Sequence, residues 1–489
     1  MLFNSHIFML LFLPLLLAGW YFLNWKKKFQ LAQGYLIGMS LWFYAYANLQ
    51  YLWLLLFSCL IGWLLSCLPE KISLEKGKKV LTGVGCVFHL GLLGYFKYSN
   101  FFLENLNTAF HTDFPMLQIL LPVGISFYTF QQLAYLIDRC RKDAPRDSFF
   151  DYLTFMVYFP QLLQGPILLR SEFMGQLKEP ERRRFHAERF SEGIQFFVFG
   201  LAKKVLLADT LAKAVNYGYS NVSMLDSISA LLLAVGYLTE LYFDFSSYCD
   251  MAVGLGKMIG LEVAENFDAP FHSASVKEFW RRWHMTLGRF FTRYVYIPLG
   301  GNRRGKMRTL CNVMIVMLLS GLWHGAAWTF VLWGFLHGVG MIWDNLEHPH
   351  LPKKWMRQAA TFAYVCMTFV FFRAESIAQG VDVLKSIVSL KWNGFVFQMA
   401  SALDMTECYI ITKALSMKLP GLLSWFWLGI FVVLIAICFR VLSGEKVSGV
   451  VALQRQKGYG RLYPVLLAVL FTWSMISMTG VSEYLYFSF

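Results

Sequence analysis

Charged side chains are scarce in this sequence. Asp, Glu, Lys and Arg make up 15% of its 489 residues, whereas a soluble domain carries about 25%. Hydrophobic residues make up 57%, and the mean hydropathy is +0.48. Apolar runs recur from the N-terminus to the last few residues. This composition excludes an ordinary soluble domain and predicts an all-α polytopic membrane protein.

The motifs of several common enzyme classes are also absent. The sequence has no Gly-x-Ser-x-Gly elbow, no His-x-x-x-His zinc pair and no P-loop, so hydrolase, zinc-enzyme and nucleotide-hydrolysis functions have no support. The nine Cys are scattered and include no Cys-x-x-Cys pair, which favours packing over metal or disulfide chemistry. We expect no metal and no tightly bound cofactor.

The positive charge is distributed in a way that indicates a membrane. The net charge of +14 comes from short Lys and Arg clusters between apolar runs. The positive-inside rule and contact with anionic headgroups produce this pattern. We therefore expect membrane lipids as partners and no nucleic acid.

Apolar runs near the ~20 residues that span a bilayer cover residues 6–23, 30–47, 50–67, 80–98, 116–137, 228–249, 422–439 and 462–479. The turn around Asn48 lacks basic residues and should lie outside, whereas the lysine-rich loop Pro69–Lys79 should be cytoplasmic. We predict one membrane-embedded domain, residues 1–489, with roughly ten to twelve spanning or nearly spanning helices. The same rule places the N-terminus and the tail Gly480–Phe489 outside.

Three segments depart from simple spans. Phe149–Leu169 has basic clusters on both sides and is broken by Pro160 and Gly165-Pro166, which predicts a re-entrant hairpin and hints at a funnel within the membrane. Ile194–Ala214 is amphipathic, and we expect Lys203 and Lys204 on its wet side.

The third of these segments is the run 228–249, whose apolar part, Leu231–Tyr242, leads into Asp244 and Asp250. Carboxylates at the end of an apolar span are costly unless they are hydrogen-bonded or reach water. Two interpretations stay open: a capped or interfacial helix end, and a wall of the active-site cavity.

The chain is organised around residues 277–343, which carry two conspicuous histidines. Residues 275–296 are predicted to form a basic interfacial helix, with aromatic side chains on one face and Arg281, Arg282, Arg289 and Arg293 on the other. His284 falls at the border of the two faces, where Lys277 and Arg281 should keep its imidazole neutral. The alternative is an interfacial histidine without a role.

His324 lies in a stretch that cannot be one straight span. Residues 309–343 contain no Asp, Glu, Lys or Arg, and as one helix they would be ~52 Å long against a hydrocarbon core of ~30 Å. The expected break is Ser320–Gly325, which would leave His324 at depth as a neutral acid–base group. The alternative is a histidine hydrogen-bonded in the bundle core. His337 would face roughly the opposite side of a continuous helix and is secondary.

These residues carry a family resemblance. The motifs are Glu265-Asn266-Phe267, Glu278-Phe279-Trp280-Arg281-Arg282-Trp283-His284, Tyr296-Ile297-Pro298-Leu299-Gly300-Gly301-Asn302-Arg303 and Trp323-His324-Gly325. Together they resemble the membrane-bound O-acyltransferase family, in its bacterial branch typified by the alginate O-acetyltransferase membrane subunit. The opening Met1–Ser5, Phe243–Ser246 and the aromatic end Glu483–Phe487 are similar to that branch as well, so the likeness spans the chain.

The resemblance implies a ring of membrane helices, with re-entrant and interfacial helices, around a central funnel that passes an acyl group across the bilayer. It implies that His324 is the principal catalytic residue and His284 a second functional histidine. The candidates for substrate or donor binding are Trp280, Arg281, Arg282, Trp323, Asp244, Asn266 and His337.

We therefore expect a bacterial inner-membrane enzyme that acetylates hydroxyls of an exported or cell-surface, alginate-like polysaccharide. The donor would be acetyl-CoA or an acyl-carrier-protein thioester on the cytoplasmic side. The expected partners are periplasmic or extracellular acetyltransferase proteins, the polysaccharide and a cytoplasmic acyl carrier. The alternatives are transfer of D-alanine or another acyl group to teichoic acid or peptidoglycan, and a non-catalytic acyl-donor transporter. The absence of an evident repeat argues against a transporter.

Overall fold

The computed structural model describes residues 1–68, 74–346, 352–442, 446–457, 460, 462–478 and 484–485. Within these ranges the chain is helical and contains no β-strand, which confirms the all-α expectation. Of the tail that we predicted to lie outside the membrane, only residues 484–485 are among those described.

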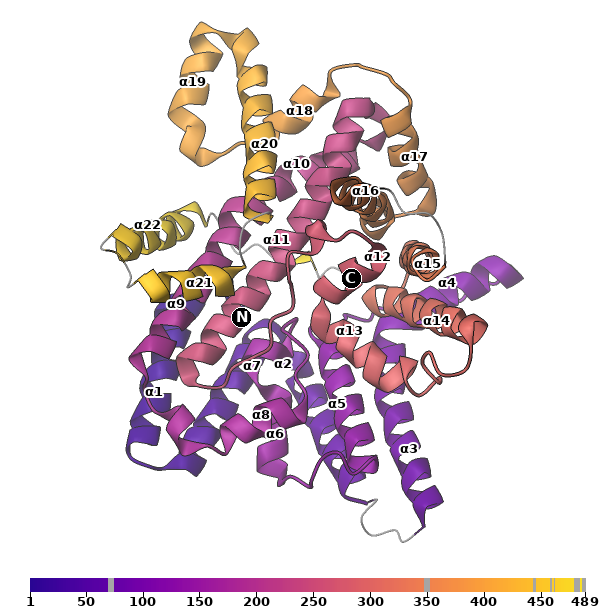
Figure 1. The fold of residues 1–489 in the computed structure, drawn as a ribbon, viewed down its shortest axis with the longest axis vertical. Helices are drawn as coiled ribbons and strands as arrows, with labels where there is room; N and C mark the ends of the chain where they lie inside the picture. Colours follow the sequence, from indigo (N-terminus) through magenta and orange to yellow (C-terminus); the bar gives the residue numbers. More distant parts are fainter. Residues whose placement is uncertain are drawn as a thin grey trace.

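Most of the helices up to α8 lie in the lower half of Figure 1. Their bounds are η1 Phe8–Phe12, α1 Leu13–Trp25, α2 Phe29–Cys67, α3 Glu75–Leu93, η3 Gly94–Tyr98, α4 Ser99–Phe110, α5 Ile125–Cys140, α6 Phe149–Val157, α7 Phe159–Leu162 and α8 Arg170–Leu177. The loop Pro69–Lys79 that we predicted to be cytoplasmic falls partly outside the described residues.

The second and third apolar runs form one helix rather than two. α2 continues for 39 residues without interruption, so the turn expected around Asn48 is wrong. Neither Gly nor Pro occurs between residues 39 and 61, and one Asn weakens a helix by only about 0.7 kcal/mol or less. A polar residue between two apolar runs is therefore not enough to end a helix.

The segment predicted to be re-entrant is a chain of short pieces. α6 and α7 are followed by a non-helical stretch before α8 begins. Every residue from 154 to 168 is buried, which meets the requirement that irregular backbone at membrane depth be enclosed by protein.

α11 is the central helix of the molecule. The elements that precede it along the chain are η4 Pro180–Arg183, α9 Ala187–Ala202, η5 Lys203–Ala208, α10 Asp209–Ser220 and η6 Val222–Met224. α11 itself covers Ser227–Ile259. Of its most apolar stretch 78% is buried, against 22–39% for the other helices long enough to span a membrane. Figure 1 shows α11 crossing the middle of the fold. Because it continues well past Asp244 and Asp250, the first of the two interpretations left open for these carboxylates, a capped or interfacial helix end, is wrong.

The next group carries the two histidines. Its elements are η7 Pro270–His272, α12 Val276–Arg282, α13 Met285–Phe291, η8 Thr292–Tyr296, α14 Lys306–His324, α15 Trp328–Trp343, α16 Lys354–Arg373 and α17 Ile377–Val388. α14 and α15 pack closely because Gly321 and Gly334 face each other. A Cβ at Gly321 would lie 2.3 Å from the carbonyl oxygen of Phe330, and one at Gly334 would lie 2.5 Å from that of Met317. Small residues at such contacts let membrane helices approach.

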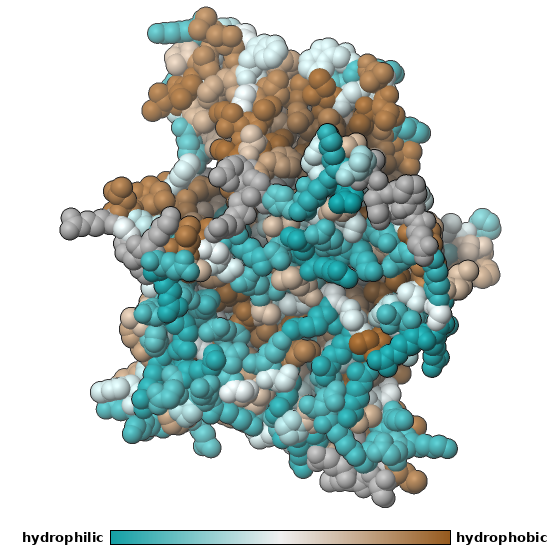
Figure 2. All heavy atoms as spheres, viewed as in Figure 1, coloured by the Kyte–Doolittle hydropathy of each residue, from teal (hydrophilic) through white to brown (hydrophobic). Residues whose placement is uncertain are grey.

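The C-terminal helices pack against α9, α10 and α11, at the top and on the left of Figure 1. They are α18 Phe395–Ser401, η9 Thr406–Cys408, α19 Tyr409–Lys418, α20 Pro420–Leu442, α21 Val447–Lys457 and α22 Leu462–Ser477. Figure 2 shows hydrophobic side chains gathered over α18–α20 and hydrophilic ones over the middle and lower part of the same face. Apolar side chains on such an outer surface suit contact with lipid tails.

Among the described residues, six helices are long and apolar enough to cross a membrane, and α15 and α22 are shorter apolar helices. The chain is thus a multi-pass helical membrane protein, while the number of ten to twelve spans stays a prediction.

Four short stretches in the described chain, η1, η3, η5 and η8, are π-helical. Such wide turns are rare and frequently occur at functional sites. Three of them carry basic residues, namely Lys97 in η3, Lys203 and Lys204 in η5, and Arg293 in η8.

Candidate functional site

His324 is the last residue of α14. The run is interrupted as predicted, but the interruption lies at residues 325–327 and not from Ser320 onward, since α14 stays helical up to His324. The imidazole is 3% exposed, and its centroid lies 4.9 Å from the Trp323 ring, 5.1 Å from Trp333 and 5.1 Å from Phe372. An aromatic enclosure of this kind keeps bulk water away from an acid–base group.

The end of α14 is held by two neighbouring residues of η3. Lys97 Nζ donates to the carbonyl oxygens of Trp323 and His324 at 2.7 and 2.9 Å, and the Tyr98 hydroxyl donates to that of Leu322. Three of the four carbonyls that a helix end leaves without partners are thereby satisfied. Our sequence analysis missed Lys97. The available signal was a lysine inside an apolar run, which is costly to keep there.

His284 lies at a break between α12 and α13. The prediction of one continuous basic helix over residues 275–296 is therefore wrong. His284 adopts a left-handed backbone with φ 46°. On either side of it, the Asp268 N–H donates to the Arg282 carbonyl and the Met285 N–H donates to the Asn266 carbonyl. A separate segment of chain thus satisfies the backbone at the break.

Asn266 also determines which nitrogen of His284 carries the proton. Asn266 Oδ1 accepts from the Thr286 N–H at 3.1 Å and from its hydroxyl at 3.0 Å, and it lies 3.2 Å from His284 Nδ1. The hydrogen-bond network therefore assigns the proton to Nδ1 and the lone pair to Nε2. No described residue hydrogen-bonds to Nε2, so this atom is available to accept a proton or a hydrogen bond from a substrate.

Burial, rather than neighbouring cations, keeps His284 neutral. Its side chain is fully buried, and burial lowers the pKa of the imidazole to about 3. Lys277 and Arg281, to which we had assigned this effect, are not its cause. Between pH 5 and 8 His284 is thus a base or an acceptor.

The two histidines lie in one site. Their ring centroids are 6.5 Å apart, and the Trp323 ring lies 6.0 Å from His284 and 4.9 Å from His324. The sequence analysis, which placed His284 on an interfacial helix and His324 at membrane depth, is wrong in separating them. Among the described residues no group of three His, Cys, Asp or Glu side chains could hold a metal ion.

A cavity of about 460 Å³ approaches this site between α12–η8 and α14–α15, and we call it the basic cavity. It extends to Ser320, one helical turn before His324. Its cationic lining residues are Lys277, Arg281 and Arg289. Three basic side chains around one cavity, of which Arg289 also pairs with Glu172, suit a ligand that bears phosphates.

A second, smaller cavity of about 40 Å³ lies at His324 itself, and we call it the Lys97 cavity. Trp323, Ser126 and Leu163 are among its other lining residues. The basic cavity and the Lys97 cavity share no lining residue. His324 thus lines the Lys97 cavity, whereas the basic cavity reaches Met285 and Ser320 near the two histidines.

The three residues of α12 that we predicted to bind the donor divide into two kinds. Trp280 and Arg281 line the basic cavity, whereas Arg282 does not. Arg281 forms no ion pair with a described residue. Of the other arginines on the predicted basic face, Arg289 lines the basic cavity, whereas Arg293 does not. Arg282, Arg289 and Arg293 pair with the carboxylates of Glu278, Glu172 and Asp138.

His337 has partners on both ring nitrogens. The Trp280 indole N–H donates to Nδ1 at 3.2 Å, so Nε2 carries the proton and donates to Thr368 Oγ1 at 2.9 Å. The side chain is buried and lines neither the basic cavity nor the Lys97 cavity. His337 thus links α12, α15 and α16 and orients Trp280.

Lys204 and Asp244 form a buried ion pair instead of facing water. Lys204 Nζ lies 2.6 Å from Asp244 and 2.9 Å from Asp209, and both Lys204 and Asp244 are 1–2% exposed. The expected wet side is therefore wrong for Lys204, whereas Lys203 is partly exposed and lines a cavity. Asp244 is a partner of this lysine in the interior, where charged groups require pairing.

Replacing Lys204 with methionine should destabilise the protein by about 3–5 kcal/mol, because the buried carboxylate of Asp244 loses its cation. Thermal unfolding in detergent measures this loss. Arg184→Met is the matched control, since its pair with Glu181 is mostly exposed, with side chains 60% and 69% accessible, and such pairs contribute about 0–1 kcal/mol. Equal effects of the two substitutions would contradict the prediction.

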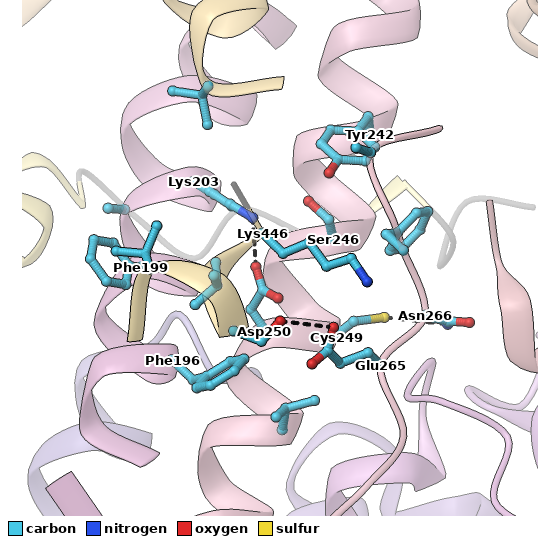
Figure 3. A pocket seen from close by; sticks show the side chains of 18 of the residues that line it. Phe196, Phe199, Lys203, Tyr242, Ser246, Cys249, Asp250, Glu265, Asn266 and Lys446 are labelled. Atoms are coloured by element: carbon cyan, nitrogen blue, oxygen red, sulfur yellow. Dashed lines mark hydrogen bonds and ion pairs between the residues drawn. The ribbon is translucent and has the colours of Figure 1, made fainter. Parts of the chain in front are cut away.

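A third cavity of about 590 Å³ lies between α9, α11 and α21 (Figure 3). Lys203 and Asp250 form an ion pair at its wall, with 2.7 Å between the charged atoms. Asn266, whose Oδ1 contacts His284, lines the same cavity. Asp250 thus belongs to the wall of a cavity beside the histidine pair, whereas Asp244 lines none of the three cavities.

Comparison with known proteins identifies the chemistry that this arrangement serves. Residues 141–379 match the membrane-bound O-acyltransferase family. The chain is 35% identical to the peptidoglycan O-acetyltransferase of Helicobacter pylori, over 80% of this chain and 80% of that relative. The chain belongs to the membrane-bound O-acyltransferase family. It is also 39% identical to the probable alginate O-acetylase of Azotobacter vinelandii, over 77% of this chain and 76% of the relative.

A more distant similarity connects this O-acyltransferase to another acyl group. The chain is 28% identical to the teichoic acid D-alanyltransferase of Bacillus subtilis, over 52% of this chain and 69% of the relative. The family match confirms the resemblance found in the motifs. The matched residues include Asn266, His284 and His324, whereas Lys97 lies outside them.

Proposed function

We propose that this acyltransferase moves an acetyl group from a cytoplasmic thioester to hydroxyls of an exported or cell-surface, alginate-like polysaccharide. The observation that carries the proposal is the pairing of His284 and His324, whose rings are 6.5 Å apart, with His324 lining the Lys97 cavity and Met285, next to His284, lining the basic cavity. The relatives named for O-acetylation of alginate and of peptidoglycan support acetyl as the group transferred.

The proposed chemistry is a single acyl transfer. A hydroxyl oxygen attacks the thioester carbonyl, a C–O bond forms and the C–S bond breaks. His324 accepts the hydroxyl proton and returns it to the departing thiolate, which is general base and general acid work by one group. His284 Nε2 accepts a hydrogen bond from a reactant and helps to orient it. The attacking hydroxyl belongs to the glycan or to an extracellular partner that passes the group on.

The donor is proposed to enter through the basic cavity. Coenzyme A and an acyl carrier protein both present a phosphopantetheine thioester, and the cations around this cavity suit its phosphate. The positive-inside rule places a basic opening of this kind on the cytoplasmic side.

Arg281→Ala should raise the KM for the thioester donor by about 10-fold or more, since hydrogen bonds to charged groups contribute about 1.5–3 kcal/mol. The neighbouring Arg282→Ala is the matched control, because Arg282 pairs with Glu278 at 2.9 Å and does not line the basic cavity. Initial rates with acetyl-CoA and with acetyl-acyl carrier protein, each varied in concentration, measure both variants. A KM that rises equally in both, or in neither, contradicts this route of entry.

The acceptor is proposed to approach from the opposite side, through the Lys97 cavity. This arrangement requires periplasmic or extracellular partner proteins and an exported glycan, in a bacterial inner membrane with both termini of the chain outside. The remaining short and interfacial helices would complete a ring of ten to twelve membrane helices around the funnel.

Mild alkaline release of ester-linked acids from the surface glycan tests the function. A strain that lacks the gene should lose ester-linked acetate and regain it on complementation. Loss of ester-linked D-alanine instead would establish D-alanine as the transferred group, as in the name of the teichoic acid D-alanyltransferase relative. Unchanged esters together with altered uptake of the donor into vesicles would establish a transporter and overturn the proposal.

A further inference from the structure

We propose that Lys97 is a positioning residue of the acyl-transfer site, because its ammonium group holds the end of α14 and with it the backbone of His324. The inference rests on the catalytic role proposed for His324. Lys97 lies in α3–η3–α4, a continuous apolar helical stretch from Glu75 to Phe110 that is long enough to span a membrane.

One ammonium group holds two consecutive carbonyls. The Lys97 bonds of 2.7 and 2.9 Å go to Trp323 and His324, directly before the non-helical residues 325–327. A helix end without partners for its last carbonyls frays. Since His324 is the final helical residue, any fraying would first displace the side chain on which the proposed chemistry depends.

The charge of Lys97 argues for more than a structural cap. An ionisable group inside an apolar span is expensive, whereas a neutral donor such as the Tyr98 hydroxyl already caps the neighbouring carbonyl of Leu322. No carboxylate among the described residues pairs with Lys97. The partial negative charge at the C-terminus of α14 is what offsets the ammonium. A cation retained at this cost lines the same cavity as His324.

The wide turn of η3 lies where two adjacent side chains reach the same helix end. Consecutive residues on a regular α-helix point about 100° apart. η3 is π-helical from Gly94 to Tyr98, and both Lys97 and Tyr98 donate to the end of α14. The π-helical turn thus contains both residues that hold the end of α14, including Lys97, which contacts the carbonyl of His324.

Lys97→Met, with Tyr98→Phe as its neighbouring control, tests the inference. Both variants remove donors to the end of α14, but only the first removes the cation and the contact with His324. We expect the kcat of Lys97→Met to fall about 10- to 100-fold, the effect of a displacement of about 1 Å at a reacting group, with the donor KM within a factor of three of wild type. Tyr98→Phe should retain kcat within a factor of three. The assay uses the full-length protein in vesicles with radiolabelled acetyl-CoA or acetyl-acyl carrier protein, whichever the wild type accepts.

Lys97→Arg keeps the charge and the donors and should recover at least part of the lost kcat. Thermal unfolding in detergent establishes whether each variant is folded, and Lys97→Gln replaces Lys97→Met if the latter is not. A folded variant without the cation that retains wild-type kcat overturns the inference, and so does a rise in KM alone. If His324→Gln itself retains activity, the role proposed for His324 fails. If His324→Gln is inactive and Lys97→Met is normal, only the role of Lys97 fails.

Discussion

His324→Gln is expected to lower the rate of acyl transfer by about 10²- to 10⁴-fold, the range that one positioned acid–base group contributes. Glutamine is polar and similar in size to histidine, so it should fill the same space between Trp323, Trp333 and Phe372. What is lost is a nitrogen that can take a proton from a hydroxyl and return it to a thiolate. Initial rates in vesicles and the ester-linked acetate of the surface glycan measure the effect.

His89→Gln is the matched control for this substitution. His89 is also a buried histidine on an apolar helix, 1% exposed, with Nδ1 3.3 Å from the Ser58 hydroxyl. It lines neither the basic cavity nor the Lys97 cavity. We expect equal membrane yields for both variants and near-normal transfer for His89→Gln. Transfer by His324→Gln within 10-fold of wild type would show that the proton is handled elsewhere.

Asn266→Leu should lower the rate by a similar factor, about 10²–10⁴, through the neighbouring histidine. Without Asn266 Oδ1 nothing holds the proton of His284 on Nδ1, and the loss of the correct tautomer in a histidine-dependent enzyme costs about 10⁴ in kcat. The donor KM should change little, because Asn266 does not line the basic cavity. Asn312→Leu, which removes an equally buried Asn that donates to the Gly301 carbonyl, is the control.

Asn266→Asp separates the tautomer from the charge. The carboxylate still accepts from Nδ1 and from Thr286, but its negative charge favours the imidazolium and raises the pKa of His284 from about 3. As the pH falls through this raised pKa, protonation blocks Nε2. The pH–rate profile of Asn266→Asp should therefore lose activity on its acid side at pH values where His284 causes no such loss in the wild type. A pH–rate profile identical to that of wild type would contradict the role assigned to Nε2.

The break near His324 was predictable because it follows from length alone. An uncharged run too long for one span must bend, and the glycines around residues 320–325 offered the place. The burial of the aromatic face of residues 275–296 was predictable as well, since periodicity reports which side chains face inward. Both arguments use only neighbouring residues.

The break at His284 was not predictable in this way. The segment 266–268, some 16 residues earlier in the chain, supplies the hydrogen bonds that open the helix there. A helical wheel assumes a continuous helix, so it placed a fully buried imidazole at a wet border. The same limit applies to Lys204, whose partner Asp244 lies 40 residues away. The burial of such side chains depends on partners far away in the sequence, and the periodicity of a single segment carries no information about those partners.

The wide turns can also be regarded as insertions. A π-helical turn holds one residue more than an α-helical turn, so η3 amounts to a helix that has gained a residue between 94 and 98. Deleting one residue there would let α3 continue into α4 as a regular helix, and the residues of the wide turn itself would change the direction in which their side chains point. Lys97 would leave the end of α14 although the composition of the span had barely changed. A one-residue gap at this place in an aligned relative therefore marks an enzyme that holds its histidine in another way.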